Sequence, residues 1–249
     1  MISRPIAIFQ HSALVGPGYF ASFLDAHGLP WRLFRADLGN SIPESPLDFA
    51  GLCFMGGEMS VNDPLPWLEA ELALIRRAVM QDIPVIGHCL GGQLMAKALG
   101  GVVTRNPVRE IGWGNVQVAD NQSAHEWLPG QQDFAAFHWH GETFTLPDGA
   151  IPLFASTHCA NQAFALGPHL GMQCHVEMTE TLIAGWVTNW HDELSAPDAP
   201  LNSIQSARAL NERTATALPE MRRVAHGLYE KWLAGVHARE LARTLPPSE

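Results

Sequence analysis

Short apolar runs alternate with segments of helical periodicity over the first hundred residues, and this alternation limits the fold more than any other feature of the sequence. Strands are expected at residues 5–10, 31–34, 50–55 and 84–86. Helices are expected at residues 16–28, 66–81 and 90–99. Strands and helices joined by short connections are typical of βαβ units, so we expect a parallel sheet covered by helices on both faces.

The pattern changes after residue 112, where short β-like segments follow one another with turns between them. These segments lie at residues 112–118, 134–139, 152–155, 163–166 and 170–174. Such a succession predicts antiparallel strands added to the sheet. We therefore expect a single three-layer α/β/α domain over residues 1–249, with a mostly parallel central sheet and an antiparallel extension.

The last part of the chain is expected to be helical. A helix is predicted at residues 180–190 and a loop at 192–203, and a final amphipathic helix follows Pro219. Its apolar stripe consists of Met221, Val224, Leu228, Trp232 and Val236. A stripe of this kind is typical of packing against a core. The core of the domain is thus expected at about 5–190, with a helical extension at about 204–243.

Charge and composition argue against several classes of partner. The net charge is -10 and no run of basic residues occurs, whereas nucleic acids and anionic membranes bind basic surfaces. No stretch approaches the roughly 18–20 apolar residues of a membrane helix, and the amino terminus does not resemble a signal peptide. Four cysteines show neither C-x-x-C pairing nor the density of a disulfide scaffold. We expect a cytoplasmic, reduced enzyme.

The most informative stretch is residues 84–93, PVIGHCLGGQ, in which a strand runs through G-x-C-x-G into a helix. A nucleophile on such a turn is held in a strained, exposed position, and the flanking glycines remove side chains that would clash with it. The helix that follows offers backbone N–H groups to an oxyanion. Cys89 is therefore the candidate nucleophile.

A cysteine nucleophile needs a base, and His175 with Glu177 is the best-placed pair. Both residues follow an expected strand. Side chains two residues apart in extended backbone point to the same face, so the Glu177 carboxylate can accept a hydrogen bond from the His175 imidazole N–H. H-x-E also begins the zinc deaminase motif, but no cysteine follows Cys174 to complete it. In α/β-hydrolases the acid precedes the histidine, which disfavours that class here, although an acid elsewhere in the chain leaves it open.

The elbow GHCLGGQ (87–93) together with GMQCHVE (171–177) resembles the class I glutamine amidotransferases, and most closely the stand-alone relatives of the glutaminase domain of GMP synthase. The family motifs read G-x-C-x-G-x-Q and G-x-Q-x-H-P-E. Residues 54–60, 110–113 and 137–144 also resemble family segments, over a span of about 6–190. Val176 and Glu58 stand where proline is usual, and Glu58 puts the shape of its turn in doubt. The resemblance implies a flavodoxin-like fold.

The resemblance also implies a role for each matching residue. Cys89 would attack the γ-amide of glutamine, His175 would act as base and then acid, and Glu177 would orient His175. The backbone N–H groups of Gly57 and Leu90 would form the oxyanion hole. The expected substrate-binding residues are Gln93, Trp139, His140, Gly141 and Glu142. No cofactor is implied.

Other polar residues are expected to have no role in the chemistry. His138 and His140 have the spacing of a metal-ligand pair, but no third ligand has a convincing spacing, so we expect pocket lining and no metal. His88 is expected to be structural or to tune the pocket, and Glu110 either faces the pocket or anchors a loop. The remaining cysteines, expected to pack as small apolar residues, are Cys53, Cys159 and Cys174.

Three functions remain open from the sequence. The first is a glutaminase that forms a γ-glutamyl thioester and releases glutamate and ammonia to a separate synthase partner. The second is a stand-alone γ-glutamyl peptidase or hydrolase. The third is a weakly active binding or regulatory module, which the intact triad disfavours. All three take glutamine or a γ-glutamyl compound as the small molecule, with no nucleic acid or membrane as partner.

Overall fold

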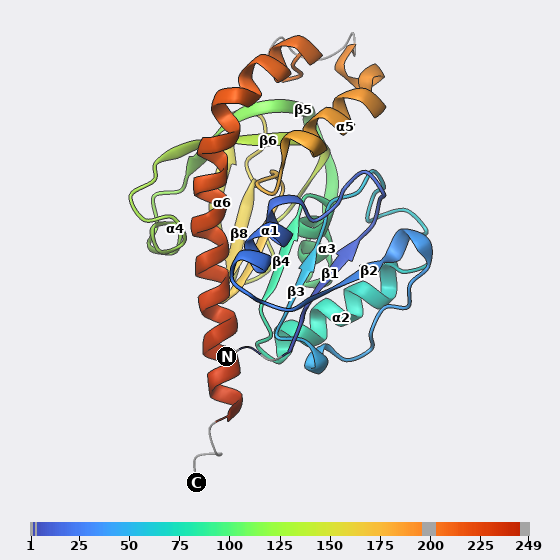
Figure 1. Cartoon of the computed structure of the whole chain (residues 1–249), viewed down its shortest axis with the longest axis vertical. Helices are drawn as coiled ribbons and strands as arrows, with labels where there is room; N and C mark the ends of the chain where they lie inside the picture. The colour runs from blue at the N-terminus through green and yellow to red at the C-terminus, as the bar shows by residue number, and fades with distance from the viewer. Residues whose placement is uncertain (1, 3, 196–202, 245–249) are drawn as a thin grey trace.

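In the computed structural model, which describes residues 2, 4–195 and 203–244, the strands form one sheet of nine (Figure 1). Their order across the sheet is β2-β1-β3-β4-β9-β8-β7-β5-β6. The strands are β1 (Ile6–Gln10), β2 (Trp31–Arg35), β3 (Gly51–Phe54), β4 (Val85–His88), β5 (Val103–Val118), β6 (Asp133–Phe144), β7 (Ile151–Ser156), β8 (Ala163–Leu166) and β9 (His169–Met172). The first half of the sheet comes from the βαβ part of the chain.

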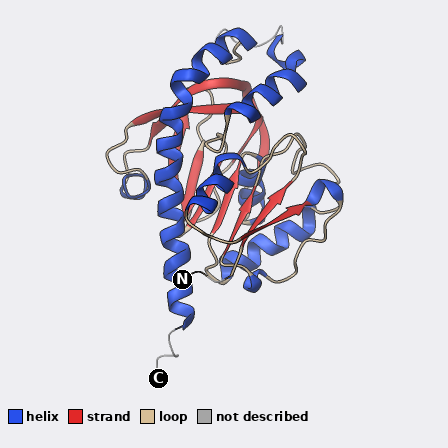
Figure 2. Ribbon diagram, in the orientation of Figure 1, coloured by secondary structure: helices blue, strands red, loops and turns tan. Residues whose placement is uncertain are grey.

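The sheet is mixed, as expected, with parallel pairing from β2 to β9 and antiparallel pairing from β9 to β6. Every residue of β1, β3, β4 and β9 is buried, as in a parallel sheet covered on both faces. The antiparallel part is larger than the sequence suggested, because β5 has 16 residues and β6 has 12. Both are long enough to curve over the carboxyl edge of the parallel strands (Figure 2).

Helices cover both faces of the sheet and bury a separate apolar core on each. The helices are α1 (Gly18–Ala26), α2 (Leu68–Met80), α3 (Leu90–Ala98), α4 (Gln122–Trp127), α5 (Glu180–Asn189) and α6 (Ala207–Thr244). Apolar side chains of α1, α4, α5 and α6 form one core with the sheet. Those of α2 and α3 form the other. The predicted three-layer α/β/α fold is therefore confirmed.

The final helix differs from the prediction in where it begins. The sequence placed its start after Pro219, but α6 begins at Ala207 and contains Pro219 in its interior. Proline removes one hydrogen bond and clashes with the preceding turn, yet Leu210 and Leu218 before it are buried in the same core as Met221 after it. This packing keeps both parts in one helix, which changes direction near its upper end (Figure 1).

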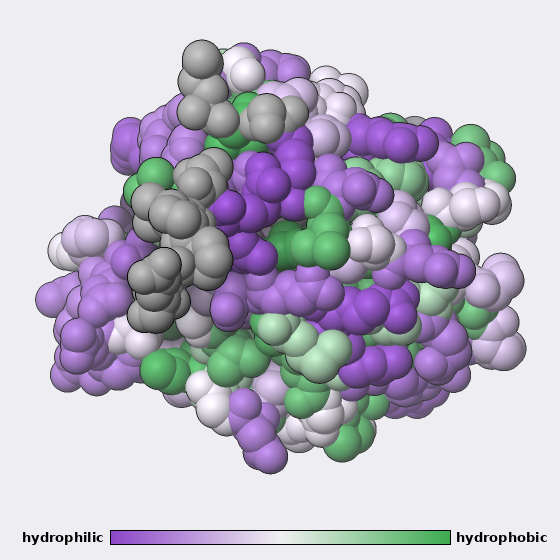
Figure 3. Space-filling view, turned by 90° about the horizontal axis from the view of Figure 1, so that it is seen from below, coloured by the Kyte–Doolittle hydropathy of each residue, from purple (hydrophilic) through white to green (hydrophobic). Residues whose placement is uncertain are grey.

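Smaller differences concern short elements. The sequence missed α4, whose six residues make fewer than two turns and give little periodicity. The expected loop 192–203 overlaps a 3-10 helix at His191–Ser195, and residues 196–202 lie outside the described part of the chain. No described helix combines the length and apolar character needed to span a membrane. Exposed apolar residues form small groups separated by polar ones on the face shown in Figure 3.

Candidate active site

Cys89 lies between the end of β4 and the start of α3 and has an unusual backbone conformation. Its φ is 50° and its ψ is -105°, in a region that costs an L-residue about 1–3 kcal/mol. Its N–H donates to the Met172 carbonyl at 2.8 Å, which ties the elbow to β9. A Cβ at Gly91 would lie 2.0 Å from the Phe54 carbonyl oxygen, so only glycine allows α3 to start this close to β3.

His175 and Glu177 form a buried pair just beyond β9. His175 Nδ1 lies 2.6 Å from Glu177 Oε1, so the contact expected from the sequence is present. The strand ends at Met172, and a single bridge to Phe137 of β6 holds His175 in place. Burial opposes protonation of His175, but the Glu177 carboxylate and the Cys89 sulfur outweigh it and raise the pKa of His175 to about 10. Burial likewise opposes ionisation of Glu177, but charged His175 lowers the Glu177 pKa to about 2.

The pair faces Cys89 across the elbow. A Cβ built on Gly56 would lie 3.1 Å from His175 Cε1 and 3.6 Å from Cys89 Cβ, so both side chains converge on this glycine. Cys89 Sγ accepts a hydrogen bond from Gln173 Nε2 at 3.5 Å and lies 4.0 Å from the Trp139 carbonyl oxygen. The geometry therefore brings a thiol, an imidazole and a carboxylate into one chain of contacts.

The two residues expected to supply oxyanion N–H groups lie beside Cys89. Gly57 lines the cavity in front of the thiol. Leu90 is the first residue of α3, where backbone N–H groups have no partner within the helix, and its side chain is buried. The turn at Gly57 rests on His11, which is fully buried and contacts Glu71 at 2.9 Å and the Met55 carbonyl at 3.0 Å. Burial disfavours charged His11, but Glu71 raises its pKa overall.

Cys89 and His175 open into a cavity of about 210 Å³. All five expected substrate-binding residues line it, and Glu177 and Leu90 lie behind its surface. The lining residues are Val15, Gly57, Glu58, Met59, Ser60, Cys89, Gln93, Arg109, Trp139, His140, Gly141, Glu142, His175, Trp186, Trp190 and Glu193. The cavity is small, three tryptophans that pack against one another form one side of it, and three glutamates and one arginine are among its polar residues, as suits a small polar molecule.

Sequence reasoning gave no role to several residues that line this cavity or lie directly behind it. Gln173 lies between Gln93, which donates to it at 3.1 Å, and Cys89. Its position inside the motif at 171–177 was a signal that it lies near the thiol. Trp186 packs edge-on against His175 with ring centroids 4.9 Å apart. Arg109, Trp186 and Trp190 gave no signal, because they come from parts of the chain outside the recognised motifs.

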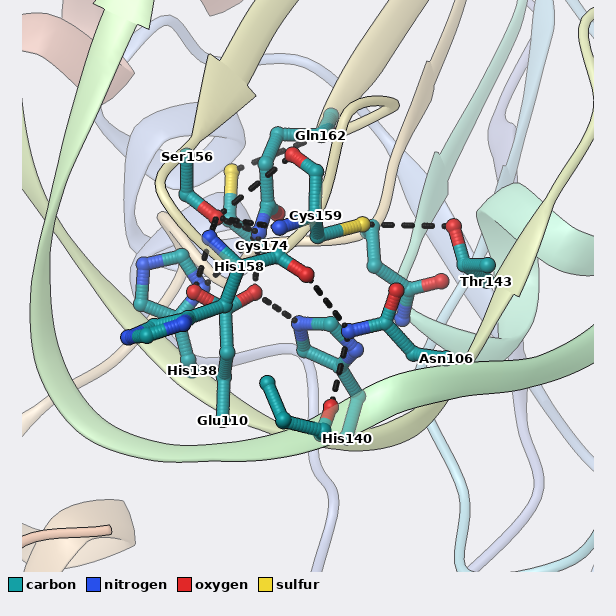
Figure 4. Close-up of polar contacts among 12 residues, drawn as sticks. Asn106, Glu110, His138, His140, Thr143, Ser156, His158, Cys159, Gln162 and Cys174 are labelled. Carbon is teal, nitrogen blue, oxygen red and sulfur yellow. Dashed lines mark hydrogen bonds and ion pairs between the residues drawn. The ribbon is translucent and has the colours of Figure 1, made fainter. Parts of the chain in front are cut away.

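Behind the cavity wall, Glu110 is the centre of a buried polar network (Figure 4). Ser156 donates to its Oε1 at 2.7 Å, and Gln162 donates to its Oε2 at 2.8 Å. His140 Nε2 lies 3.0 Å from the same Oε2. Burial opposes ionisation, but the contact with His140 and, to a smaller extent, the neighbouring His138 and Ser156 lower the pKa of Glu110 to about 2. Of the two roles left open for Glu110, the structure thus supports the anchor.

The same network contains the candidate metal ligands of the described part of the chain. Ligand atoms of Glu110, His140 and Cys159 all lie within 4.8 Å of one another. Both Glu110 oxygens already accept hydrogen bonds, and Cys159 Sγ lies 3.2 Å from the Thr143 hydroxyl. His138 shares a strand face with His140 but lies outside the cavity, and burial lowers its pKa to about 3. We interpret Glu110, His140 and Cys159 as part of a hydrogen-bonded network that holds the cavity wall in place.

The fold and the site define an α/β protein with a cysteine on a strand-to-helix elbow beside a buried histidine–glutamate pair. Residues 26–187 match the sequence profile of the family described as Glutamine amidotransferase class-I. The chain therefore belongs to the class I glutamine amidotransferase family, as its motifs indicated. The match contains both the elbow at Cys89 and the segment of His175 and Glu177.

Individual relatives are similar over different shares of their length. The glutamine amidotransferase-like protein YfeJ of Salmonella typhimurium is 28% identical over 210 residues, which is 81% of this chain and 88% of YfeJ. The GMP synthase (glutamine-hydrolyzing) of Paraburkholderia phymatum is 33% identical over 146 residues, 53% of this chain but only 26% of the synthase. The crystal structure of a glutamine amido transferase from Methylobacillus flagellatus is 43% identical, covers 93% of this chain and 95% of that one, and superposes with a TM-score of 0.87.

Proposed function

We propose that the protein hydrolyses the γ-amide of glutamine or of a γ-glutamyl compound through a thioester on Cys89. The observation that carries the proposal is the contact chain from Cys89 to His175, which both line a small cavity, and on to Glu177 behind its surface. The relatives named for glutamine amidotransfer or glutamine hydrolysis support glutamine as the substrate class.

In the proposed reaction, the Cys89 thiolate adds to the γ-carbonyl carbon, and the carbonyl electrons move to oxygen. The N–H groups of Gly57 and Leu90 stabilise this oxyanion, and one such donor contributes roughly a hundred- to a thousandfold in rate. His175 protonates the departing nitrogen, so ammonia or an amine leaves and a γ-glutamyl thioester remains. Water, deprotonated by His175, then attacks the thioester, releases glutamate and restores the thiol.

Glu177 holds His175 in the orientation required for both proton transfers and stabilises its charged form. We place the reaction in the cytoplasm, because the thiol must stay reduced and all four cysteines are free. A synthase that accepts the ammonia is the partner suggested by the GMP synthase relatives, of which this chain matches the smaller part.

The test measures ammonia release from L-glutamine and amine release from γ-glutamyl dipeptides by wild type and by Cys89→Ala. In parallel, a glutamine-like electrophile (6-diazo-5-oxo-L-norleucine) is used to label the protein, and the labelled residue is found by mass spectrometry. We expect turnover and labelling at Cys89 in wild type and in the control Cys53→Ala, whose thiol is buried in the sheet. Wild type that neither turns over nor acquires the label would refute the proposal, whereas labelling with slow turnover indicates a requirement for a partner.

A further inference from the structure

β5 contains a bulge that faces the cavity. Arg105 pairs with Glu142 of β6, and the next pair along β5 is Glu110 with His140, so residues 106–109 stand opposite Gly141 alone. Two side chains fix this bulge. Asn106 Nδ2 donates to the Val108 carbonyl at 2.7 Å and to the His158 carbonyl at 2.9 Å. Glu110 anchors the other end through the buried network shown in Figure 4.

The bulge places Arg109 in the cavity mouth. Among the described residues that line the cavity, Arg109 is the only arginine or lysine, and three glutamates share the lining with it. Its stem lies over Gly141, where an added Cβ would be 3.4 Å from Arg109 Cγ. Its guanidinium forms an ion pair with Glu193 of the 3-10 helix, and Trp139 Nε1 donates to the same Glu193 oxygen at 3.4 Å.

In this ion pair, another carboxylate can take the place of the Glu193 carboxylate. The Arg109 and Glu193 side chains are 44% and 36% exposed, and exposed pairs of this kind contribute little to stability. A guanidinium binds any carboxylate through two parallel hydrogen bonds, so a carboxylate on a substrate can replace that of Glu193 at little cost.

We propose that Arg109 binds a carboxylate of the substrate, and that Glu193 is the internal carboxylate which the substrate displaces. This inference rests on the proposed γ-glutamyl chemistry. Trp139 lies beside Cys89 and Gly141 lies under Arg109, so the two positions are two strand residues, or about 7 Å, apart. The four bonds from the γ-carbonyl carbon to the α-carboxyl carbon of a glutamyl unit span about 5 Å, and a charge-assisted hydrogen bond adds about 3 Å. The spacing favours the α-carboxylate.

The test compares wild type with Arg109→Ala, Arg109→Lys and Glu193→Gln on four amides. L-Glutamine and γ-glutamylethylamide keep the α-carboxylate, L-glutaminamide lacks it, and γ-glutamylglycine adds a second carboxylate on the leaving group. We expect Arg109→Ala to raise KM about 10- to 100-fold for the three substrates with an α-carboxylate, with kcat changed only a few-fold, and to leave KM for L-glutaminamide unchanged. Arg109→Lys should recover part of the loss, and Glu193→Gln should lower KM for L-glutamine.

The outcomes separate the two proposals. A loss confined to γ-glutamylglycine would assign Arg109 to the leaving-group carboxylate and still support a carboxylate site. An equal effect of Arg109→Ala on all four amides, or no effect on any, would overturn the assignment of Arg109 while leaving the γ-glutamyl chemistry intact. Wild type that turns over none of the four and is not labelled at Cys89 would overturn both.

Discussion

The charge on Glu110 should be a measurable source of stability, and Glu110→Gln tests it with little change of shape. Glutamine has nearly the same shape, and its oxygen can still accept from Gln162. The hydrogen bond from Ser156 is lost, because Ser156 Oγ already accepts from the N–H groups of His158 and Cys159 and cannot readily accept from the new amide, so the pH dependence of the loss is what isolates the charge. The side chain is 6% exposed, so solvent screens the charge little. The shift of its pKa from 4.5 to about 2 corresponds to about 3 kcal/mol of unfolding free energy at neutral pH.

The sign of the pH dependence follows from the direction of that shift. Because the folded pKa is below the unfolded one, the contribution is complete above about pH 4.5 and is lost as pH falls through about 2. Urea unfolding at pH 7.0 should therefore show a gap of about 3 kcal/mol between wild type and Glu110→Gln, and at pH 3.5 a gap of about 2 kcal/mol. The exposed control Glu220→Gln should stay within about 0.5 kcal/mol of wild type at both pH values. A difference in unfolding free energy that does not change with pH, or one below about 1 kcal/mol at pH 7.0, would show that the charge of Glu110 does not stabilise the fold.

Three further changes test the elbow and its supports by urea unfolding. Gly91→Ala puts a Cβ against the backbone of β3 and should cost about 1–3 kcal/mol or prevent folding. Tyr229→Phe removes the 3.0 Å hydrogen bond to buried His88 and should cost about 1–3 kcal/mol; a loss below 0.5 kcal/mol would contradict this. Glu177→Gln breaks the charged pair with His175, whose pKa is raised while that of Glu177 is lowered. Its cost should be largest at pH 4.5–6.5 and shrink towards pH 2 and pH 10, and a cost independent of pH would argue against a charged pair.

The Tyr229→Phe prediction also tests the role of His88. The sequence left open whether His88 has a structural role or tunes the pocket. His88 is fully buried beneath the elbow and is not part of the cavity lining. It forms a hydrogen bond with the Tyr229 hydroxyl of α6. Burial lowers its pKa, so it is held neutral beside the charged pair. The long helix α6 therefore supports the residue that precedes Cys89, a connection that no local sequence pattern contains.

The sequence predicted those parts of the site whose residues are close together in the chain. Cys89 lies inside one βα turn, and His175 and Glu177 are two residues apart, so strand and turn geometry alone bring their chemistry together. The same holds for the parallel strands and for α2 and α3, where apolar periodicity and glycine turns give the boundaries to within a few residues.

The parts that the sequence did not predict depend on contacts across the sheet. Glu110 meets Ser156 and Gln162, 46 and 52 residues further along the chain, only because β7 pairs with β5 and β8 pairs with β7. The bulge that presents Arg109 is a local irregularity in pairing, which propensity does not reveal. The sequence predicted a helix start at Pro219, because a proline inside a helix has a high free-energy cost. Burial of the apolar residues on both sides of Pro219 outweighs that cost.

The two halves of the sheet thus contribute different parts of the site. The parallel half holds Cys89 and Gly57 on rigid turns at strand ends, where backbone geometry fixes the positions that the proposed chemistry needs. The antiparallel half supplies the wall from Trp139 to Glu142 and, through the bulge, Arg109. Since Glu110 holds the wall through His140, changes in that network should alter which of the proposed substrates binds before they alter how the Cys89 thiol reacts. If the proposed chemistry holds, substrate preference can therefore change through the antiparallel half while Cys89 keeps its position.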